Sequence, residues 1–543
     1  MFKLTDTQSE LYELEQYSGS GVTWLTGDVF LTGKIDTKIA LESIQEIVMQ
    51  NEIFHLRIVT SNDKNEPKWE YVENIDLEKC TGIREFDESI ACIEAIDEAN
   101  FESYNKAYLE WVNKEMENVP RMTEQLFKIW IVRRGNEIGM LLMMNHIISD
   151  GWTMSKIAEK FIKLYNAKLK NDTYDVTTNS YIEIMKEEQE YLKTNRFLKD
   201  KQFWENQIDK CSELTVLANH KMDQMKSRRV QLDLSKEHSK KIIEFCKKEK
   251  ISEYVLYLSA LGEVFHEQTN SDDFYIGSTL TNRTGRKRKD ALGLLANTVP
   301  IYFSFKEEKQ DKNVDNYIGS VKNFVGEVFR HQKHTYNRIL KENNIGKIFD
   351  VSLNYQVASI LDDVSSDLTF YNVPYQIESL VVHIFMTTDK QYKIMFDYQE
   401  EVFKDWEIKA LQKHFMTFID RVVDDWENFR EKNARKVNLI TKAEKELVLG
   451  IFNDTKCDIK GYTIDGMFEE QVKKYPKKTA IIFGNEKITY EELNARANYV
   501  ANKLNEKKIG VGDFVAISAS KSVEKKKIGL CQNLGKIKRC VKT

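Results

Sequence analysis

A run of seven apolar residues, 138–144, sets the strongest constraint on how this chain can fold. A run of this length is typical of a strand that is buried on both faces. Apolar residues then recur at helical spacing, at Ile157, Phe161, Leu164 and Tyr165. Between the two lies a polar heptapeptide, Asn145-His146-Ile147-Ile148-Ser149-Asp150-Gly151. The pattern therefore places this heptapeptide on a strand-to-helix loop beside the core, where functional groups are often found.

His146 and Asp150 are the residues of this loop that could carry chemistry. An imidazole can take or give a proton near neutral pH. A carboxylate four positions later can be held in place without touching a substrate, and Gly151 permits a tight turn with close approach to the backbone. On its spacing alone, the loop favours a simpler interpretation, namely a buried structural histidine beside a helix-capping aspartate.

The wider sequence changes that interpretation. The loop resembles the H-H-x-x-x-D-G active-site motif of the condensation domains of nonribosomal peptide synthetases, and Trp152-Thr153 matches the W-[ST] that follows it. Other segments resemble further motifs in the family's order, across roughly residues 1–440. They are Thr5–Leu14 for S-x-A-Q-x-R-L-W-x-L, Asn51-Glu52 with His55-Leu56-Arg57 for R-H-E-x-L-R-T, Leu292–Thr298 for [IV]-G-x-F-V-N-T, His331-Gln332 for H-Q, and Asp350–Asn354 for D-x-S-x-N.

Three positions depart from the family pattern. Asn145 replaces the first histidine of the pair, but the second histidine, to which the family's chemistry is assigned, is present as His146. We expect Asn145 to fill the packing role of the missing histidine by hydrogen bonding. Glu10 stands where arginine is usual, and the acidic and proline positions after Gln332 are lost. We expect these last two changes to lie away from the chemistry.

The resemblance implies a fold of the α/β (α+β) class. Two chloramphenicol-acetyltransferase-like lobes would form a V, with the active site in a central tunnel between them. We expect residues 1–175 to form the N-terminal lobe, 176–435 the C-terminal lobe and 436–461 a linker. The residues themselves predict a strand over 126–132 that forms an antiparallel hairpin with the strand preceding His146.

A further segment, 462–520, resembles the start of an adenylation domain, because Ile488–Asn494 matches its L-[TS]-Y-x-E-L motif. No Ser/Thr/Gly-rich phosphate-binding loop follows, so the backbone donors that would hold ATP are missing. We predict no adenylation activity. Residues 521–543 are expected to be a basic, disordered tail, either a solvated end or the product of a frameshift. The sequence also lacks the L-G-G-x-S site at which a carrier domain receives phosphopantetheine.

The activity that the resemblance implies is amide formation. The amine of an acceptor aminoacyl thioester would attack the carbonyl of a donor acyl or peptidyl thioester. Both would be held on phosphopantetheine arms, delivered in trans by carrier proteins that belong to other synthetase modules. His146 is expected to bind the attacking amine and then either remove a proton or stabilise the charge of the intermediate.

The other site residues are expected to support the site or to line the tunnel. Asp150 is assigned as the ion-pair partner of Arg57, whose guanidinium can grip a carboxylate with two nitrogens; the alternative is a helix N-cap. Gly151 is expected to let the acceptor arm pass close to the backbone. The residues expected to line the tunnel are Ser149, Trp152 and Asn297, although the sequence favours the core over the tunnel wall for Trp152.

Composition and charge narrow the classes of protein to which this chain could belong. A net charge of −5 gives no reason to expect nucleic-acid or membrane binding. No apolar run approaches the roughly 18 residues of a membrane span, and the first residues lack a signal peptide's pattern. The seven cysteines include no C-x-x-C pair, which predicts reduced thiols in a cytoplasmic protein. The nine histidines show no metal-binding spacing, so we predict no metal site.

Two other interpretations stay open. The chain could be an acyltransferase of the same superfamily that uses acyl-CoA and a free amine or alcohol, although the adenylation-like segment argues against this. It could also be a truncated synthetase remnant that only binds carriers, which Asn145 and Glu10 favour and which His146, Asp150 and Gly151 oppose. The sequence does not identify the donor, the acceptor or their stereochemistry.

Overall fold

The long apolar run forms β7 (Glu137–Asn145), the central strand of a five-stranded sheet. As predicted, β7 pairs antiparallel with the strand before it, β6 (Phe127–Arg134). Its other neighbour is β2 (Trp24–Thr32), also antiparallel. The edge strands are β5 (Thr81–Glu85), parallel to β6, and β12 (Thr369–Phe370), antiparallel to β2. This central position explains why the interior of β7 carries no polar side chain.

The structure is a computed structural model that describes most of the chain. Its described residues are 1–509, 513 and 515, without 20, 33–35, 61–65, 87–97, 136, 209–224, 307–312, 358–367, 373–374 and 457–462. The expected tail at 521–543 therefore lies outside the described residues, as do five of the seven cysteines. The other two, Cys80 and Cys246, are free and buried. The chain divides into two compact units, Met1–Thr441 and Lys442–Thr543.

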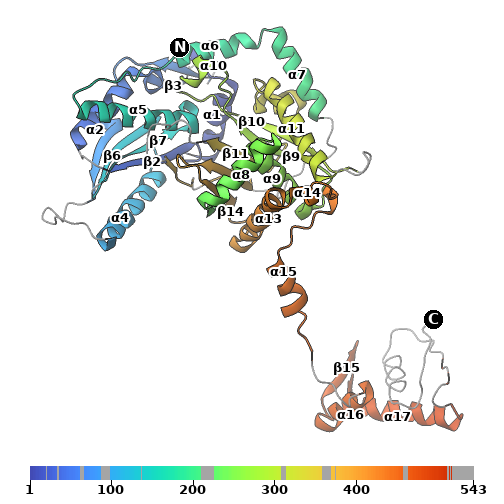
Figure 1. Cartoon of the computed structure of the whole chain (residues 1–543). Helices are drawn as coiled ribbons and strands as arrows, with labels where there is room; N and C mark the ends of the chain where they lie inside the picture. The colour runs from blue at the N-terminus through green and yellow to red at the C-terminus, as the bar shows by residue number, and fades with distance from the viewer. Residues whose placement is uncertain are drawn as a thin grey trace. The chain divides into compact units, whose positions relative to one another are not determined.

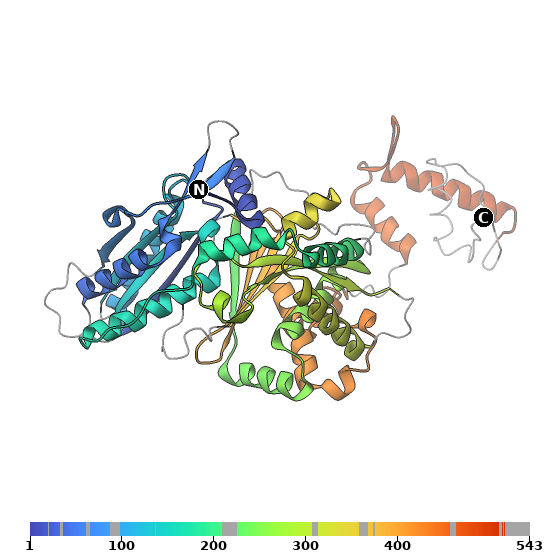
Figure 2. The same cartoon turned by 90° about the horizontal axis from the view of Figure 1, so that it is seen from above.

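Helices cover both faces of the five-stranded sheet. Two of them, α2 (Thr37–Gln50) and α5 (Gly151–Leu169), lie side by side over one face, as Figures 1 and 2 both show. They bury that face of β7, including Met140. The other face is covered by α4 (Glu98–Glu117), which buries Leu141. Because adjacent strand residues point to opposite faces, a strand enclosed in this way must be apolar throughout.

A six-stranded sheet forms the second half of the first unit. Its strand order is β10 (Asn297–Ser304), β9 (Asp273–Leu280), β11 (Val351–Val357), β13 (Leu380–Met386), β14 (Tyr392–Gln399) and β8 (Ser227–Asp233). Only the β9–β11 and β11–β13 pairs are parallel. The helices that contribute to the large hydrophobic core of this half include α8 (Lys236–Glu249), α9 (Glu253–Thr269), α11 (Val314–His331) and α13 (Asp405–Asp424).

A short crossover joins the two sheets. Strand β12 comes from the later part of the chain, yet it pairs with β2 in the first sheet. Next to it, the hydroxyl of Tyr371 donates a hydrogen bond to the buried carboxylate of Asp28, which also accepts one from Tyr108 at 2.6 Å. A two-residue strand has no alternation that a sequence pattern could reveal, so this link was not predicted.

The remaining elements of the first unit are short or peripheral. Strands β1 (Phe2–Lys3), β4 (Pro67–Tyr71) and β3 (Leu56–Thr60) form a small sheet. The other helices are α1 (Asp6–Ser18), η1 (Glu52–His55), α3 (Leu77–Cys80), η2 (His146–Ile148), α6 (Tyr181–Tyr191), α7 (Asn195–Ile208), α10 (Gly285–Lys289), α12 (Tyr336–Asn343), α14 (Trp426–Phe429) and η5 (Ala434–Lys436). Within the described ranges, no helix combines the length and hydropathy that a transmembrane span requires.

The second unit has a small core of its own. It begins with α15 (Lys442–Glu446) and the π-helical η6 (Leu447–Ile451). Helix α16 (Ile464–Lys474), the hairpin β15 (Thr479–Phe483) and β16 (Glu486–Thr489), and α17 (Tyr490–Glu506) follow. Ile488 and Leu493, both from the adenylation-like motif, are buried in this core. Thr489 and Glu492 form a capping box at the start of α17, which explains this part of the motif by local structure.

Candidate active site

The loop after β7 borders a cavity of 680 Å³. Both halves of the first unit contribute to its wall. His146, Gly151 and Trp152 come from the β7–α5 connection, while Asn297, Asn354 and His383 come from the six-stranded sheet. The structure therefore brings together residues that lie more than two hundred positions apart in the sequence.

His146 is the first residue of η2, and backbone contacts fix its position. Its amide N–H donates to the carbonyl of Thr23 at 2.6 Å. The imidazole is half-buried and lines the cavity, but its buried Nδ1 has no hydrogen-bond partner among the described residues. In the part of the chain that the structure describes, no carboxylate therefore orients this ring in the way that the aspartate of a catalytic triad orients its histidine. Asp150 is turned toward a different group.

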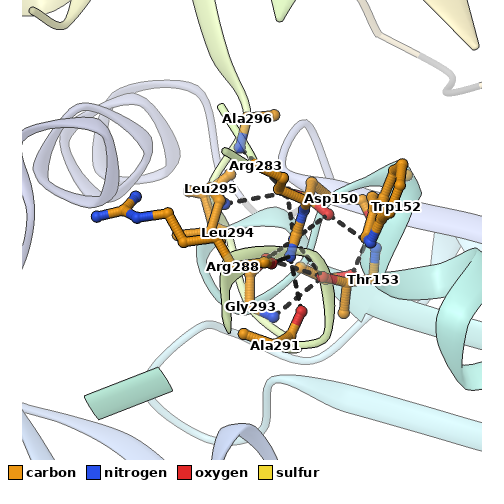
Figure 3. A network of polar contacts seen from close by, with 12 residues as sticks. Asp150, Trp152, Thr153, Arg283, Arg288, Ala291, Gly293, Leu294, Leu295 and Ala296 are labelled. Atoms are coloured by element: carbon orange, nitrogen blue, oxygen red, sulfur yellow. Dashed lines mark hydrogen bonds and ion pairs between the residues drawn. The ribbon is translucent and has the colours of Figure 1, made fainter. Parts of the chain in front are cut away.

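The carboxylate of Asp150 is paired with Arg283, which corrects the expected pairing with Arg57. Nη2 of Arg283 lies 3.0 Å from Oδ1 and 2.9 Å from Oδ2 of Asp150, and both side chains are almost wholly buried (Figure 3). Arg57 instead donates to the carbonyls of Phe54 and Leu56 at 3.1 and 2.8 Å. Arg283 belongs to none of the recognised motifs, so no sequence signal pointed to it.

Further hydrogen bonds complete the surroundings of Asp150. Oδ1 accepts from the amide of Thr153 at 2.8 Å, so Asp150 is also the N-cap of α5. Oδ2 accepts from the amides of Leu295 and Ala296 at 3.0 and 3.1 Å. Burial alone would raise the pKa of Asp150, but the charge of Arg283 and these donors hold it below its ordinary value. Asp150 is thus ionised at neutral pH and acts as a brace between the loop after β7 and the segment before β10.

Asn145 lies behind the loop, not in the cavity wall. Its side chain is fully buried, and Nδ2 donates to Oε2 of Glu15 and to Oγ1 of Thr23, both at 2.9 Å. Its Oδ1 accepts from the amide of Ile147 at 3.0 Å and so caps η2. Glu15 in turn accepts from the amide of Met122 at 2.9 Å. This network connects α1, β7 and η2 behind His146.

The residues expected to line the tunnel fall into two groups. Gly151, Trp152 and Asn297 all line the cavity. Trp152 is half-buried and donates from Nε1 to the carbonyl of Lys289 at 3.0 Å. Ser149 does not line the cavity, so that expectation was wrong: it is fully buried in the tight loop that places Asp150 at the start of α5.

Sequence reasoning also missed three acidic residues of the cavity wall, Glu10, Glu378 and Asp397. Glu10 was expected to lie away from the chemistry, but it lines the cavity together with Glu378. Burial, and then the negative charge of Glu378, raise the pKa of Glu10 from 4.5 to about 7. Burial also raises the pKa of Glu378. Glu10 lies on α1, whose position beside the cavity depends on tertiary packing and could not be deduced from its local sequence.

The described residues contain no group of histidine, cysteine, aspartate and glutamate side chains that could hold a metal ion. The polar groups of the cavity are instead arranged for hydrogen bonding. They include the histidines His146 and His383, amide side chains on β10 and β11, and the carboxyls of Glu10 and Glu378. A cavity with polar groups from both halves of the first unit suits the binding of two reactants that meet within it.

Comparisons with known proteins agree with this geometry. The protein-family model of the condensation domain matches residues 1–449, and the family model of the AMP-binding enzyme matches residues 468–525. Surfactin synthase subunit 1 of Bacillus subtilis (strain 168) is 25% identical over 96% of this chain, and bacitracin synthase 3 of Bacillus licheniformis is 26% identical over 70%. The chain covers only 14% and 6% of these two synthases.

Solved structures show the same fold. The first condensation domain of the calcium-dependent antibiotic synthetase, in complex with a substrate analogue, aligns with 81% of this chain and 99% of its own length. The TM-score is 0.68 at 14% identity. The starter condensation domain of rhizomide synthetase in complex with C8-CoA gives the same TM-score at 15% identity, over 81% of this chain and 98% of its own. The first unit of this chain belongs to the condensation-domain family of nonribosomal peptide synthetases and has its α/β fold, and a segment of the AMP-binding family follows it.

Proposed function

We propose that this chain forms an amide bond between a donor acyl or peptidyl thioester and an acceptor aminoacyl thioester. The amine nitrogen of the acceptor attacks the thioester carbon of the donor, the carbon–sulfur bond breaks, and the proton lost by nitrogen ends on the released thiol. The observation that carries this proposal is the cavity of 680 Å³ with His146 in its wall and both halves of the domain around it. Such an enclosure can hold two reactants at once.

His146 contacts the reacting amine in this proposal. Its Nδ1 has no hydrogen-bond partner among the described residues, so no described carboxylate orients the ring for proton transfer. Binding of the amine and stabilisation of charge in the intermediate therefore contribute alongside proton transfer. A thioester and a free amine are already reactive, and holding them in line accounts for much of the acceleration. Gly151, Trp152 and Asn297 would contact the substrates or their arms.

Carrier proteins supply the substrates in trans. The chain lacks the serine motif to which phosphopantetheine is attached, and its adenylation-like segment lacks a phosphate-binding loop. We infer that the chain binds no cofactor of its own and adenylates no amino acid. It would work in the cytoplasm with the carriers of other synthetase modules. Residues 1–175 and 176–435 would act as the two lobes, with 436–461 as a linker to the segment at 462–520.

A second candidate function is acyl transfer from coenzyme A. The observation that favours this function is that the starter condensation domain of rhizomide synthetase, which resembles this chain, was solved in complex with C8-CoA. The chemistry at the carbonyl would be unchanged. Only the source of the donor differs, so a direct comparison of donors separates the two functions.

The experiment supplies the purified chain with a panel of fatty-acyl and aminoacyl donors, each loaded on a carrier protein or on coenzyme A. Aminoacyl carriers serve as acceptors, and mass spectrometry of the carriers detects the amide product. We expect product from carrier-bound donors, and no amino-acid-dependent ATP–pyrophosphate exchange. Product only from coenzyme A donors would favour the second function. Binding of charged carriers without product would identify a non-catalytic remnant.

A further inference from the structure

A second histidine, His383 on β13, lines the same cavity as His146. Its Nε2 lies 3.3 Å from Oδ2 of Asp397 on β14. Its Nδ1 lies 3.4 Å from Nδ2 of Asn354 on β11. Asp397 is also gripped by Arg229 of β8, whose Nε and Nη2 donate to Oδ1 and Oδ2 at 2.7 and 2.8 Å. Polar side chains of four neighbouring strands in the six-stranded sheet thus form one connected series of contacts.

The geometry fixes the direction of these contacts. Burial would raise the pKa of Asp397, but hydrogen bonds from Arg229 and its charge hold it at about 2, so Asp397 is a carboxylate. Nδ2 of Asn354 faces Nδ1 of His383 and can only donate a hydrogen bond, so Nδ1 accepts it. The ring proton of His383 then lies on Nε2, toward Asp397.

The amide of Asn354 is consequently oriented with Nδ2 toward His383, and its Oδ1 accepts no hydrogen bond from any described residue. Asn354 is half-buried and lines the cavity. Gln356, two residues later, points to the same face of β11, since strand side chains alternate. A Cβ placed on Gly151 would lie only 2.7 Å from Nε2 of Gln356, so this face of β11 abuts the loop that carries His146.

We propose that Oδ1 of Asn354 accepts a hydrogen bond from the attacking amine, and that His383, Asp397 and Arg229 are positioning residues that hold Asn354 in the required orientation. This inference rests on the proposed function. A primary amine that directs its lone pair at the acyl carbon has two N–H groups left to satisfy. His146 contacts the amine from the first half of the domain, and Asn354 accepts the remaining N–H from β11 of the second half. The site is therefore built for acceptors with a primary amine.

The test compares two acceptors, the N-acetylcysteamine thioesters of leucine and of N-methylleucine, with the donor that gives the highest turnover in the panel above. The N-methyl acceptor has one N–H fewer. The measured quantity is kcat/KM for the leucyl acceptor divided by kcat/KM for the N-methyl acceptor. Loss of one neutral hydrogen bond corresponds to about a three- to tenfold effect. We expect Asn354→Ala to lower this ratio by about that factor, mainly through the leucyl acceptor.

Variants of the positioning residues separate orientation from packing. His383→Leu removes the acceptor for Nδ2 of Asn354 and should lower the ratio as Asn354→Ala does. His383→Gln restores an acceptor oxygen and should recover most of the ratio. The matched control is His238→Ala, because His238 also pairs with a carboxylate, Asp420 at 2.8 Å, but is not among the residues that line the cavity. Its ratio should equal that of the wild type.

The results of these measurements separate the role of Asn354 from the proposed function. A ratio that is unchanged in both Asn354→Ala and His383→Leu, while the wild type forms product, would overturn the role of Asn354 and leave the proposed function intact. An equal loss with both acceptors would also overturn it, because a purely structural role predicts that result. Absence of any product from the wild type would overturn the proposed function and this assignment with it.

Discussion

At the scale of single residues, the position of His146 depends on buried polar contacts that its own ring does not make. Asn145 caps η2 from behind, and Asp150 fixes the other end of the loop through its bonds to Arg283, Leu295 and Ala296. The imidazole of His146 lines the cavity and, in the proposed function, needs free space in front of it, so its support must come from neighbours along the chain. Substitutions at these neighbours should therefore act first on stability.

Asp150→Ala should lower the free energy of unfolding by about 3–5 kcal/mol, because it leaves the buried Arg283 charge without a partner. Asp36→Ala is the control, since Asp36 caps α2 by accepting from the amide of Ile39 at 3.0 Å but forms no buried ion pair. Asp36→Ala should lower the free energy of unfolding by about 1 kcal/mol, the value of a helix cap alone. Denaturant unfolding measures this free energy for both variants. Equally small decreases for the two would contradict the ion-pair role assigned to Asp150.

The depressed pKa of Asp150 also predicts a pH dependence. The stabilisation is fully present above the ordinary pKa of 3.8 and is lost as the pH falls through the lower pKa of the folded state. The wild type should therefore lose stability relative to Asp150→Ala when the pH is lowered below about 4. Melting curves at several acidic pH values measure this difference.

The raised pKa of Glu10 predicts a change of stability with pH that is opposite in sign to that of Asp150. Its pKa of about 7 in the folded protein, against an ordinary 4.5, means that the folded state binds an extra proton between these values. The stability contribution is present below pH 4.5 and is lost as the pH rises through about 7. Glu10→Gln should remove this decline, so its melting temperature should gain on the wild type as the pH rises from about 5 to 8. Glu13→Gln, at an exposed position of the same helix, should follow the wild type.

The difference between predicted and observed site residues has a physical cause at this scale. His146 and Gly151 were predicted because their chemistry is confined to one short loop. The partner of Asp150 was not, because Arg283 lies 133 positions away and only the tertiary fold brings the two charges together. Asn354 was recognised as part of a motif, but its orientation depends on His383 and Asp397, which no local pattern connects to it.

At the scale of elements, the segment before β10 holds the ion pair of Asp150 and Arg283 in place. Gly293 has a φ of +141°, and its carbonyl accepts from Arg283 and from Thr153, both at 2.8 Å. Its backbone also passes close to the buried ring of Tyr181. This geometry requires a residue without a Cβ. The sequence pattern singled out this glycine within a motif but did not reveal the aromatic ring against which it packs.

Gly293→Ala should be strongly destabilising, because its Cβ would lie 2.2 Å from Cδ2 of Tyr181. Overpacking of this kind costs about 1–3 kcal/mol, and the strained φ adds to it. Gly319→Ala is the control: Gly319 lies in α11 with nothing near its Cβ position. It should gain up to about 1 kcal/mol from helix propensity. Equal effects of the two substitutions on unfolding would contradict the packing described here.

The elements that could be predicted were those with long, regular patterns. The β6–β7 hairpin and α5 follow from an apolar run and from helical spacing, and the structure confirms them. Strand β12 escaped prediction because two residues carry no period, and its pairing with β2 is created by the tertiary fold. Local periodicity therefore predicted the framework of the first sheet but not the link that closes its edge.

At the scale of the whole molecule, the first unit contains every residue assigned to the cavity, and its two large cores are separate from the small core of the second unit. Residues 1–441 should therefore melt at nearly the same temperature as the first unit of the full chain and form amide at a similar rate. Calorimetry and the carrier assay on both proteins test this. A large loss of rate on truncation would show that the second unit supports the site.

The central claim is that His146 acts on an amine inside the shared cavity. The most direct measurement is the single-turnover rate of amide formation with both substrates loaded on carrier proteins, for the wild type, His146→Ala and the surface control His238→Ala. General acid–base and positioning effects predict a loss of at least about tenfold for His146→Ala alone. An unchanged rate for His146→Ala, with its fold intact by circular dichroism, would contradict the account.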